Sequence, residues 1–242
     1  ADLSLHRTIG GLIKKYSKNQ VDIREIAKSL VEWDNIRNIL DLGCGYGWFE
    51  EALSGSYDVI LGVDCLEDNE GEFLRIARRC AKKPLFKKLL LPAPIEVGDS
   101  YFDLVVSAYS LYFFPESIPE VKRLLRNGGV FLIITHSESM LEEGERHFDF
   151  TNLRRVINNF SAENGEQVLK RYFNNISTVM YENYLIFTEA DADDLARYID
   201  FKREFILKDV DPDLVRKKML DELRSKGFLR FNKNDSIFLV QK

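Results

Sequence analysis

Residues 38–49 read Asn-Ile-Leu-Asp-Leu-Gly-Cys-Gly-Tyr-Gly-Trp-Phe, and this stretch decides the fold. It begins as a short apolar strand that carries an acid, Asp41, and continues with glycine at alternate positions 43, 45 and 47. Glycine is required where the backbone adopts a positive φ or approaches a ligand closely. A helix is expected to begin at Trp48. A strand, a tight glycine turn and a helix N-terminus together form a cradle for a nucleotide-containing cofactor.

A second apolar segment, residues 59–64, ends in Asp64, about 20 residues beyond the glycines. In a nucleotide-binding βαβ unit, an acid at this position accepts hydrogen bonds from ribose hydroxyls. The dinucleotide fingerprint Gly-x-Gly-x-x-Gly would need its third glycine where Trp48 stands. The spacing therefore favours a different nucleoside cofactor, and a purely structural glycine turn is the alternative interpretation.

The pattern Asp-x-Gly-x-Gly-x-Gly resembles motif I of the class I S-adenosylmethionine-dependent methyltransferases, in particular their small-molecule, methyltransferase-11 (UbiE-like) branch. The resemblance implies an α/β, Rossmann-like class I fold. Its expected parts are a seven-stranded, mostly parallel sheet with an antiparallel edge strand, an N-terminal helix and a helical insertion. It also implies that S-adenosylmethionine is the cofactor and S-adenosylhomocysteine the product, with the glycines under the methionine part and Asp64 at the ribose.

The third strand is expected at residues 87–91, which places Leu91 where many family members carry an acid for the adenine amino group. Pro92 follows and has no N–H to offer the adenine ring. Adenine is therefore expected to be held mainly by apolar contact, or weakly. The complete set of expected cofactor-binding residues is Asp41, Leu42, Gly43, Cys44, Gly45, Tyr46, Gly47, Asp64, Cys65, Leu91, Pro92, Ser107 and Tyr109.

Three residues beyond the glycine loop are candidates for catalysis. Tyr109 and Tyr112 lie in a segment that resembles motif IV of the small-molecule branch, and an aromatic face is favourable beside a cationic sulfonium. His136 follows a predicted strand at residues 130–135 and could act as a general base, because its unperturbed pKa lies near neutrality. The alternatives are packing tyrosines and a structural histidine. A base is needed only when the methyl acceptor arrives protonated, because the cofactor supplies the chemistry.

The 242 residues are expected to form a single methyltransferase domain. Its expected parts are an N-terminal helical lid or cap (1–37), a cofactor-binding core (38–136), a helical insertion over the active site (137–174) and a part that completes the sheet (175–242). Tyr16 is either a lid residue or, more simply, a packing tyrosine.

Capping and turn signals predict several elements of the chain. Helices are expected at residues 71–81 and at 117–125, the latter ended by the glycines of Asn127–Gly129. A capping box at Thr188 and Asp191 precedes another helix. Asp211-Pro212 begins, and Gly227 ends, a further one. The turn at 232–235 predicts a hairpin between strands 228–231 and 236–240, the last of which would be the antiparallel edge strand.

Composition excludes several classes of protein. The net charge of −5 argues against a globally basic nucleic-acid binder. No apolar run approaches the roughly 18 residues of a membrane span, and no secretory signal is evident at the N-terminus. The three cysteines have no metal-binding spacing. We therefore expect a cytoplasmic enzyme with reduced thiols, no metal and no membrane partner.

Three functions remain open from the sequence. The favoured one is methyl transfer to a small-molecule acceptor. The second is an RNA methyltransferase that uses the basic face at residues 75–88, although few aromatic residues are interleaved there for base stacking. The third is a catalytically degenerate methyltransferase fold that serves as a partner module, an interpretation supported mainly by Leu91 and Pro92.

Overall fold

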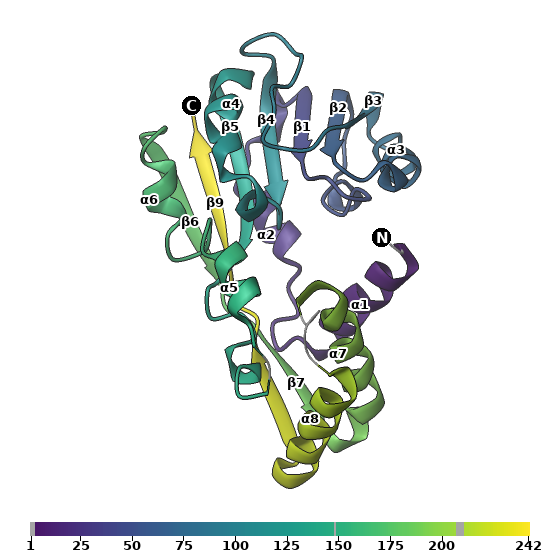
Figure 1. Cartoon of the computed structure of the whole chain (residues 1–242). Helices are drawn as coiled ribbons and strands as arrows, with labels where there is room; N and C mark the ends of the chain where they lie inside the picture. The colour runs from purple at the N-terminus through teal and green to yellow at the C-terminus, as the bar shows by residue number, and fades with distance from the viewer. Residues whose placement is uncertain (1–2, 148, 207–210) are drawn as a thin grey trace.

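The computed structural model describes residues 3–147, 149–206 and 211–242 (Figure 1). Its main feature is a seven-stranded sheet with the order β3-β2-β1-β4-β5-β9-β6. β1 to β5 are parallel, and β9 runs antiparallel to both of its neighbours. The strands are β1 (Asn38–Leu42), β2 (Tyr57–Asp64), β3 (Ala81–Lys88), β4 (Phe102–Ala108), β5 (Leu125–His136), β6 (Asn175–Tyr181) and β9 (Asp235–Gln241).

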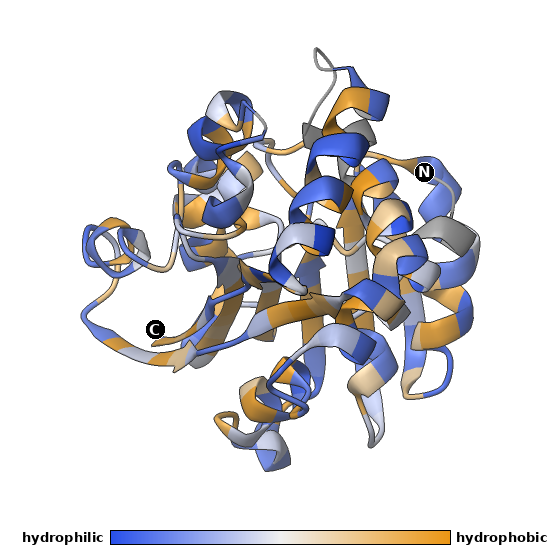
Figure 2. Ribbon diagram, turned by 90° about the horizontal axis from the view of Figure 1, so that it is seen from below, coloured by the Kyte–Doolittle hydropathy of each residue, from blue (hydrophilic) through white to orange (hydrophobic). Residues whose placement is uncertain are grey.

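Helices cover both faces of this sheet, because its strands present apolar side chains on alternate sides. On one face, Leu40 and Phe131 pack with residues of α4 and α6. On the other face, Ile39 and Leu132 pack with residues of α2 and α3. Figure 2 shows the strands mainly in hydrophobic colours and the helices with both kinds of residue interleaved. These helices are α2 (Ile23–Ser29), α3 (Glu70–Ala77), α4 (Ile118–Leu124) and α6 (Gly165–Leu169).

A second hydrophobic core lies beyond the carboxyl ends of the parallel strands, in the lower part of Figure 1. It packs helices against a two-stranded antiparallel sheet of β7 and β8. Tyr16 belongs to this core: its ring contacts Phe187, and its hydroxyl donates to Asp194. The elements are α1 (Leu3–Tyr16), α5 (Thr151–Ile157), α7 (Ala192–Ile206), α8 (Pro212–Lys226), β7 (Tyr184–Thr188) and β8 (Phe228–Asn232).

The mostly parallel seven-stranded sheet confirms the predicted fold, but the antiparallel strand is not at its edge. β9 lies between β5 and β6, and β6 is the edge strand. The predicted hairpin is also wrong, because β8 pairs with β7 while β9 pairs with β5 and β6. The reason is burial: Ile237 and Phe238 pack on opposite faces of the large sheet, so β9 suits a central position.

The third strand is β3 at residues 81–88, not 87–91 as the apolar pattern predicted. β3 is an edge strand with one neighbour, and lysines on such a strand protect its open edge from pairing with other chains. Because of these lysines, residues 81–88 lack the apolar run from which a buried strand is predicted. The helix predicted at 71–81 is shorter than expected. It ends at Ala77, because the chain must turn before the strand that begins at Ala81.

Two predictions about glycine turns are wrong as well. The segment after the glycine loop forms only a 3-10 turn at Glu50–Ala52, because Gly55, with φ 116°, ends any helix within two turns. Asn127–Gly129 lies inside β5 and does not cap α4. The capping box at Thr188 and the start and end of α8 at Asp211 and Gly227 are confirmed.

Candidate active site

The glycine loop follows β1 and takes the left-handed conformation at all three glycines, with φ of 68° at Gly43, 52° at Gly45 and 95° at Gly47. A Cβ at Gly43 would lie 2.5 Å from the Cβ of Ser110, so only glycine fits there. A Cβ at Gly45 would meet no heavy atom within 4 Å. The loop is therefore packed on one side and open at Gly45.

Asp64 at the end of β2 holds this loop in place. Its Oδ2 atom accepts a hydrogen bond of 2.9 Å from the Gly45 amide. Its Oδ1 atom accepts from the amide of Leu66 at 2.8 Å and from the side chain of Asn69 at 3.3 Å. The carboxylate thus joins the carboxyl ends of β1 and β2, which is the edge where open α/β sheets bind ligands.

The other residues predicted to bind the cofactor differ in how deeply they are buried. Ser107 is buried and hydrogen bonds to Ser110, whose Oγ atom donates to the Leu42 carbonyl. Cys44 is also buried, and burial raises the pKa of its thiol. In contrast, Cys65 and Pro92 are exposed at the ends of β2 and β3, while Leu91 packs into the core. Tyr46 is half-buried beside the guanidinium of Arg7.

Two acids lie buried at the glycine loop. Asp41 was predicted from the sequence, and Glu50, in the 3-10 turn after the loop, was not. Burial and the neighbouring Glu50 raise the pKa of Asp41 well above its usual range, and burial raises the pKa of Glu50 to about 7. The sequence held no signal for Glu50, because a glutamate near a helix start is ordinarily solvated.

The candidate catalytic residues Tyr109 and His136 meet at the carboxyl ends of β4 and β5, with rings stacked at a centroid distance of 4.5 Å. Both contact Asp235, the first residue of β9. The Tyr109 hydroxyl donates to Oδ2 at 2.7 Å, and His136 Nδ1 lies 2.7 Å from Oδ1. The Lys233 ammonium donates to both oxygens, at 2.9 and 3.1 Å. One buried carboxylate therefore accepts from three side chains.

Opposite charges compensate each other in the cluster of Tyr109, His136, Lys233 and Asp235. Asp235 and Lys233 are almost completely buried. Burial opposes ionisation of Asp235, but the Lys233 charge and the hydrogen bonds from His136 and Lys233 outweigh it and hold the pKa of Asp235 below its usual range. Burial and the Asp235 carboxylate raise the pKa of Tyr109 well above its usual range, so its phenol stays protonated. The sequence did not reveal Asp235 or Lys233, because both lie in what reads as a solvated polar turn.

Aromatic rings extend the cluster toward the glycine loop. Tyr112 stacks on His136 at 5.8 Å, and Trp48 lies 5.5 Å from the ring of Tyr109. Tyr109 itself has φ 58°, and its amide donates to Ile134, which fixes the ring over the end of the sheet. All the predicted catalytic residues are thus brought together, and Trp48 connects them to the cofactor loop.

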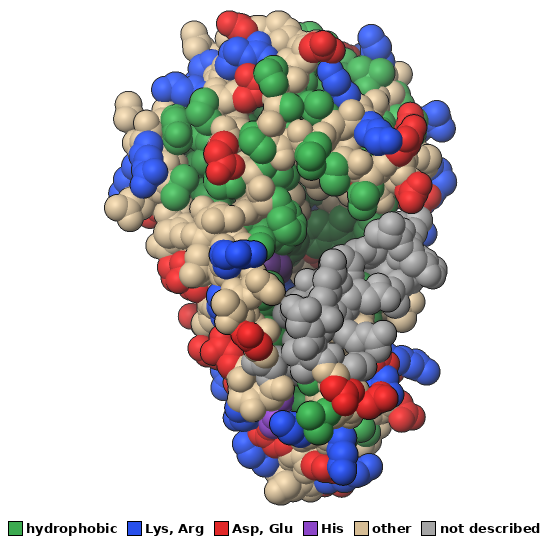
Figure 3. Space-filling model, in the orientation of Figure 1, with side chains coloured by type: hydrophobic (Ala, Val, Ile, Leu, Met, Phe, Trp, Pro, Cys, Tyr) green, Lys and Arg blue, Asp and Glu red, His purple; other side chains and the backbone are tan. Residues whose placement is uncertain are grey.

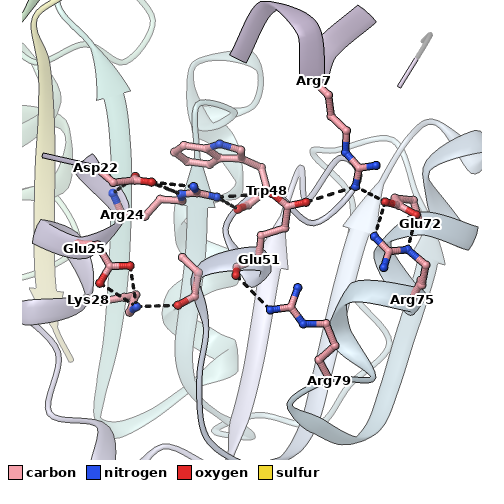
Figure 4. A network of polar contacts seen from close by, with 11 residues as sticks. Arg7, Asp22, Arg24, Glu25, Lys28, Trp48, Glu51, Glu72, Arg75 and Arg79 are labelled. Atoms are coloured by element: carbon pink, nitrogen blue, oxygen red, sulfur yellow. Dashed lines mark hydrogen bonds and ion pairs between the residues drawn. The ribbon is translucent and has the colours of Figure 1, made fainter. Parts of the chain in front are cut away.

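A polar network ties the N-terminal helices to the glycine loop (Figure 4). Arg24 of α2 donates to the Trp48 carbonyl at 2.7 Å and lies over the indole ring. Arg7 of α1 pairs with Glu51 and with Glu72 of α3. α1 is therefore fastened across the turn that follows the loop.

The surface around the carboxyl ends of β2, β3 and β4 carries exposed apolar side chains. Leu90 is 74% exposed and Leu66 44% at the ends of β3 and β2, and Phe113 is 64% exposed after β4. Figure 3 shows hydrophobic side chains gathered beside a hollow between the large sheet and the second core. Among the residues that the structure describes, no cluster of three or more His, Cys, Asp or Glu could hold a metal ion, and no helix is long and apolar enough to cross a membrane.

Comparison with known proteins agrees with this geometry. Residues 40–133 match the family described as "Methyltransferase domain". These residues contain the glycine loop, Asp64 and the segment with Tyr109. By this match they form a methyltransferase domain. The match ends inside β5, so His136, Lys233 and Asp235 lie outside it.

Solved structures share the fold at low sequence identity. A Bacillus halodurans protein described as a methyltransferase is 14% identical with a TM-score of 0.59, over 90% of this chain and 98% of that one. An S-adenosylmethionine-dependent methyltransferase from Aquifex aeolicus is 12% identical with a TM-score of 0.53, over 72% and 88%. A search of curated proteins finds no match.

A third structure carries a ligand. Phosphoethanolamine N-methyltransferase 2 of Haemonchus contortus, solved with phosphomonomethylethanolamine and S-adenosylhomocysteine, is 17% identical with a TM-score of 0.52, over 90% of this chain and 52% of that one. The residues present here fit such a cofactor. Gly45 faces open space, and the buried Asp41 offers an oxygen that no described residue occupies.

Proposed function

We propose that this methyltransferase acts on a small-molecule acceptor that arrives with a proton on its nucleophilic atom, and that His136 removes this proton. The observation that carries the proposal is the cluster of His136, Asp235, Lys233 and Tyr109 at the carboxyl ends of β4 and β5. An aligned donor and a positioned base are what an in-line displacement of this kind requires.

The chain's own residues would divide the work between binding and proton transfer. Asp235 accepts the Nδ1 proton of His136, which leaves the lone pair of the neutral imidazole on Nε2. That nitrogen would take the acceptor's proton as the new bond to carbon forms. The bound cofactor supplies the methyl group and the sulfonium leaving group. Tyr109, Tyr112 and Trp48 would surround the developing charge and exclude water.

The cofactor would be held by the glycine loop and the strand ends beside it. Asp64 keeps the Gly45 amide in place and retains acceptor capacity for the ribose. Leu66 and Leu90, which sequence reasoning did not select, supply the apolar surface that adenine needs where Pro92 has no donor. The residues we propose for cofactor binding are Asp41, Leu42, Gly43, Cys44, Gly45, Tyr46, Gly47, Asp64, Cys65, Leu91, Pro92, Ser107 and Tyr109.

RNA is a poorer acceptor than a small molecule for this protein. Several basic residues of the face at 75–88 are already paired with acids: Lys82 with Asp58, Lys87 with Glu96 and Lys88 with Glu67. A phosphate-tracking surface needs unpaired cations that release counterions on binding. The paired lysines suit the protection of an edge strand better.

Titration calorimetry with S-adenosylmethionine and S-adenosylhomocysteine tests the cofactor site first, on the wild type and on Asp64→Ala. Micromolar binding that weakens at least tenfold in the variant supports the site. Screening of small acceptors with labelled methyl donor follows, and turnover should fall about a hundredfold or more in His136→Gln while binding persists. A folded wild type that binds neither compound would overturn the proposal in favour of a non-enzymatic module.

A further inference from the structure

Lys233 is a buried lysine whose ammonium lies beside both the carboxylate and the imidazole of the proposed catalytic cluster. It is one of the two residues between β8 and β9, and it is 6% exposed. Its Nζ atom donates to the two oxygens of Asp235, at 2.9 and 3.1 Å, and lies 3.4 Å from Nδ1 of His136. Burial of an ammonium is costly unless a partner compensates its charge. Asp235 is that partner, and His136 lies within reach of both charges.

Hydrogen bonding alone does not require a lysine at this position. The Asp235 carboxylate already accepts from the Tyr109 hydroxyl on Oδ2 and from His136 Nδ1 on Oδ1, each at 2.7 Å. Because Nδ1 of His136 donates to Asp235, it is a donor, as is the ammonium of Lys233, so their 3.4 Å contact is not a hydrogen bond. The main contribution of Lys233 is therefore a positive charge next to the imidazole ring.

This charge opposes protonation of the ring. A positive imidazolium would be attracted by Asp235 at 2.7 Å and repelled by Lys233 at 3.4 Å. Since the energy between charges falls only with the inverse of their distance, the repulsion offsets most of the attraction. Among the residues that the structure describes, Asp235 and Lys233 are the charged groups in contact with His136.

Other titratable groups around the cluster do not add a charge at the ring. The phenols come from four elements, the end of β4, the 3-10 turn after it, β6 and α7: they are Tyr109, Tyr112, Tyr181 and Tyr198. Burial raises the pKa of each phenol, so all four are uncharged at neutral pH. Two acids that follow β5, Glu138 and Glu163, accept hydrogen bonds from serine hydroxyls.

The backbone holds the lysine in place. The Lys233 amide donates to the Asn183 carbonyl at 3.0 Å, and the Asn183 amide donates to the side chain of Asn234 at 2.8 Å. The Asn234 carbonyl in turn accepts from the Ser137 amide, just after β5. The ammonium also lies 5.2 Å from the centroid of the Tyr109 ring. The connection between β8 and β9 is thus fixed on two sides, which keeps the charge beside His136.

We propose that Lys233 is a positioning residue that keeps the imidazole of His136 neutral and ready to accept a proton at neutral pH. This inference rests on the proposed role of His136 as the base. A carboxylate alone favours the imidazolium, which has no lone pair for the acceptor's proton and would repel the sulfonium of the bound cofactor. With the ammonium beside it, Asp235 fixes the tautomer of His136 without driving the ring into its charged form.

Nuclear magnetic resonance titration of the histidine rings tests this in the protein without cofactor or acceptor. His136→Gln assigns the signal, since the chain has three histidines. In the wild type we expect a His136 midpoint below about pH 7. Lys233→Gln keeps a hydrogen-bond donor but removes the charge, and it should raise the midpoint by about one pH unit or more. Lys233→Arg keeps the charge and should titrate within about half a unit of the wild type.

Two further variants separate the charge from a structural effect. Lys226→Gln removes an exposed lysine that pairs with Glu222 on α8, and it should leave the His136 midpoint unchanged. The double variant Lys233→Met with Asp235→Asn removes both charges and should titrate within about half a unit of the wild type. It also decides the case in which Lys233→Gln does not fold.

Two results would overturn the inference. One is a His136 midpoint that stays unchanged in a folded Lys233→Gln variant. The other is a midpoint that falls by about one unit or more in the double variant, because Asp235 would then have acted on the ring without compensation by Lys233. The proposed function fails separately, when His136→Gln retains full turnover.

Discussion

His136 and Asp235 are direct cross-strand partners, and their side chains lie 2.7 Å apart between Nδ1 and Oδ1. They are 99 residues apart in the chain. The antiparallel pairing of β5 with β9 brings them together, since opposite residues on neighbouring strands project side by side. The pairing that completes the sheet therefore also builds the proposed base and its orienting carboxylate.

The Lys233–Asp235 ion pair is buried, so removal of either partner should be costly and removal of both should be less so. Lys233→Met or Asp235→Asn alone should each lower the free energy of unfolding by about 3 kcal/mol, because each removes one charge of the ion pair and leaves the other charge buried. The double variant should recover at least half of the summed loss. Urea unfolding of the four proteins measures this. Simple additivity of the two losses would contradict the coupling.

The raised pKa of Glu50 predicts that stability falls with pH. The pKa of this group is about 7 in the folded chain against an ordinary value of 4.5, so the folded state holds the proton more tightly. Its contribution to stability is fully present below about pH 4.5 and is lost as pH rises through 7. The loss is about 3 kcal/mol.

Unfolding of Glu50→Gln in urea at pH 5, 6, 7 and 8 tests this linkage. The variant should become more stable than the wild type at pH 8 and lose its advantage toward pH 5. Two parallel stability curves would show that Glu50 is ionised throughout, which would contradict the burial argument.

Gly45 and Gly128 allow a matched test of the cofactor cradle. Both have a positive φ and an open space where a Cβ would stand, so alanine should cost about 1–2 kcal/mol at each. Only Gly45 faces the proposed site. Gly45→Ala should weaken S-adenosylhomocysteine binding at least tenfold, whereas Gly128→Ala should leave the dissociation constant unchanged. Equal affinities in calorimetry would mean that the open face at Gly45 is not used.

Arg7 should control how long the cofactor stays bound. It connects α1 to Glu51, in the turn after the glycine loop, and to Glu72 of α3, through ion pairs on the surface (Figure 4). Because exposed pairs contribute little, Arg7→Ala should change the free energy of unfolding by less than about 1 kcal/mol and speed S-adenosylhomocysteine dissociation about two- to fivefold.

Stopped-flow displacement measures this rate, with Lys14→Ala on the same helix as the control. Added salt should speed dissociation from the wild type and have less effect on Arg7→Ala, since it screens the same pairs. Identical rates in the three proteins would show that α1 does not hold the cofactor.

The sequence by itself determined the elements whose signals are local. The strand, acid and alternate glycines at 38–47 specify a cofactor loop, because positive φ and missing Cβ atoms are properties of single residues. The N-cap at Asp211 and the left-handed Gly227 likewise fix the ends of α8 from neighbouring residues. Tyr109 and His136 were found because each follows a buried strand, and the carboxyl ends of parallel strands meet at one edge.

Only the tertiary structure decided what depends on distant pairing. The entry of β9 between β5 and β6 rests on burial of both of its faces, which no turn signal at 232–235 reveals. That entry turns a polar loop residue, Asp235, into the buried partner of His136 and places Lys233 against it. Glu50 is buried for a similar reason, because segments that are distant in the chain shield it from solvent. Burial and cross-strand contact are properties of the packed whole, so the charges that matter most here could not be read from their neighbours.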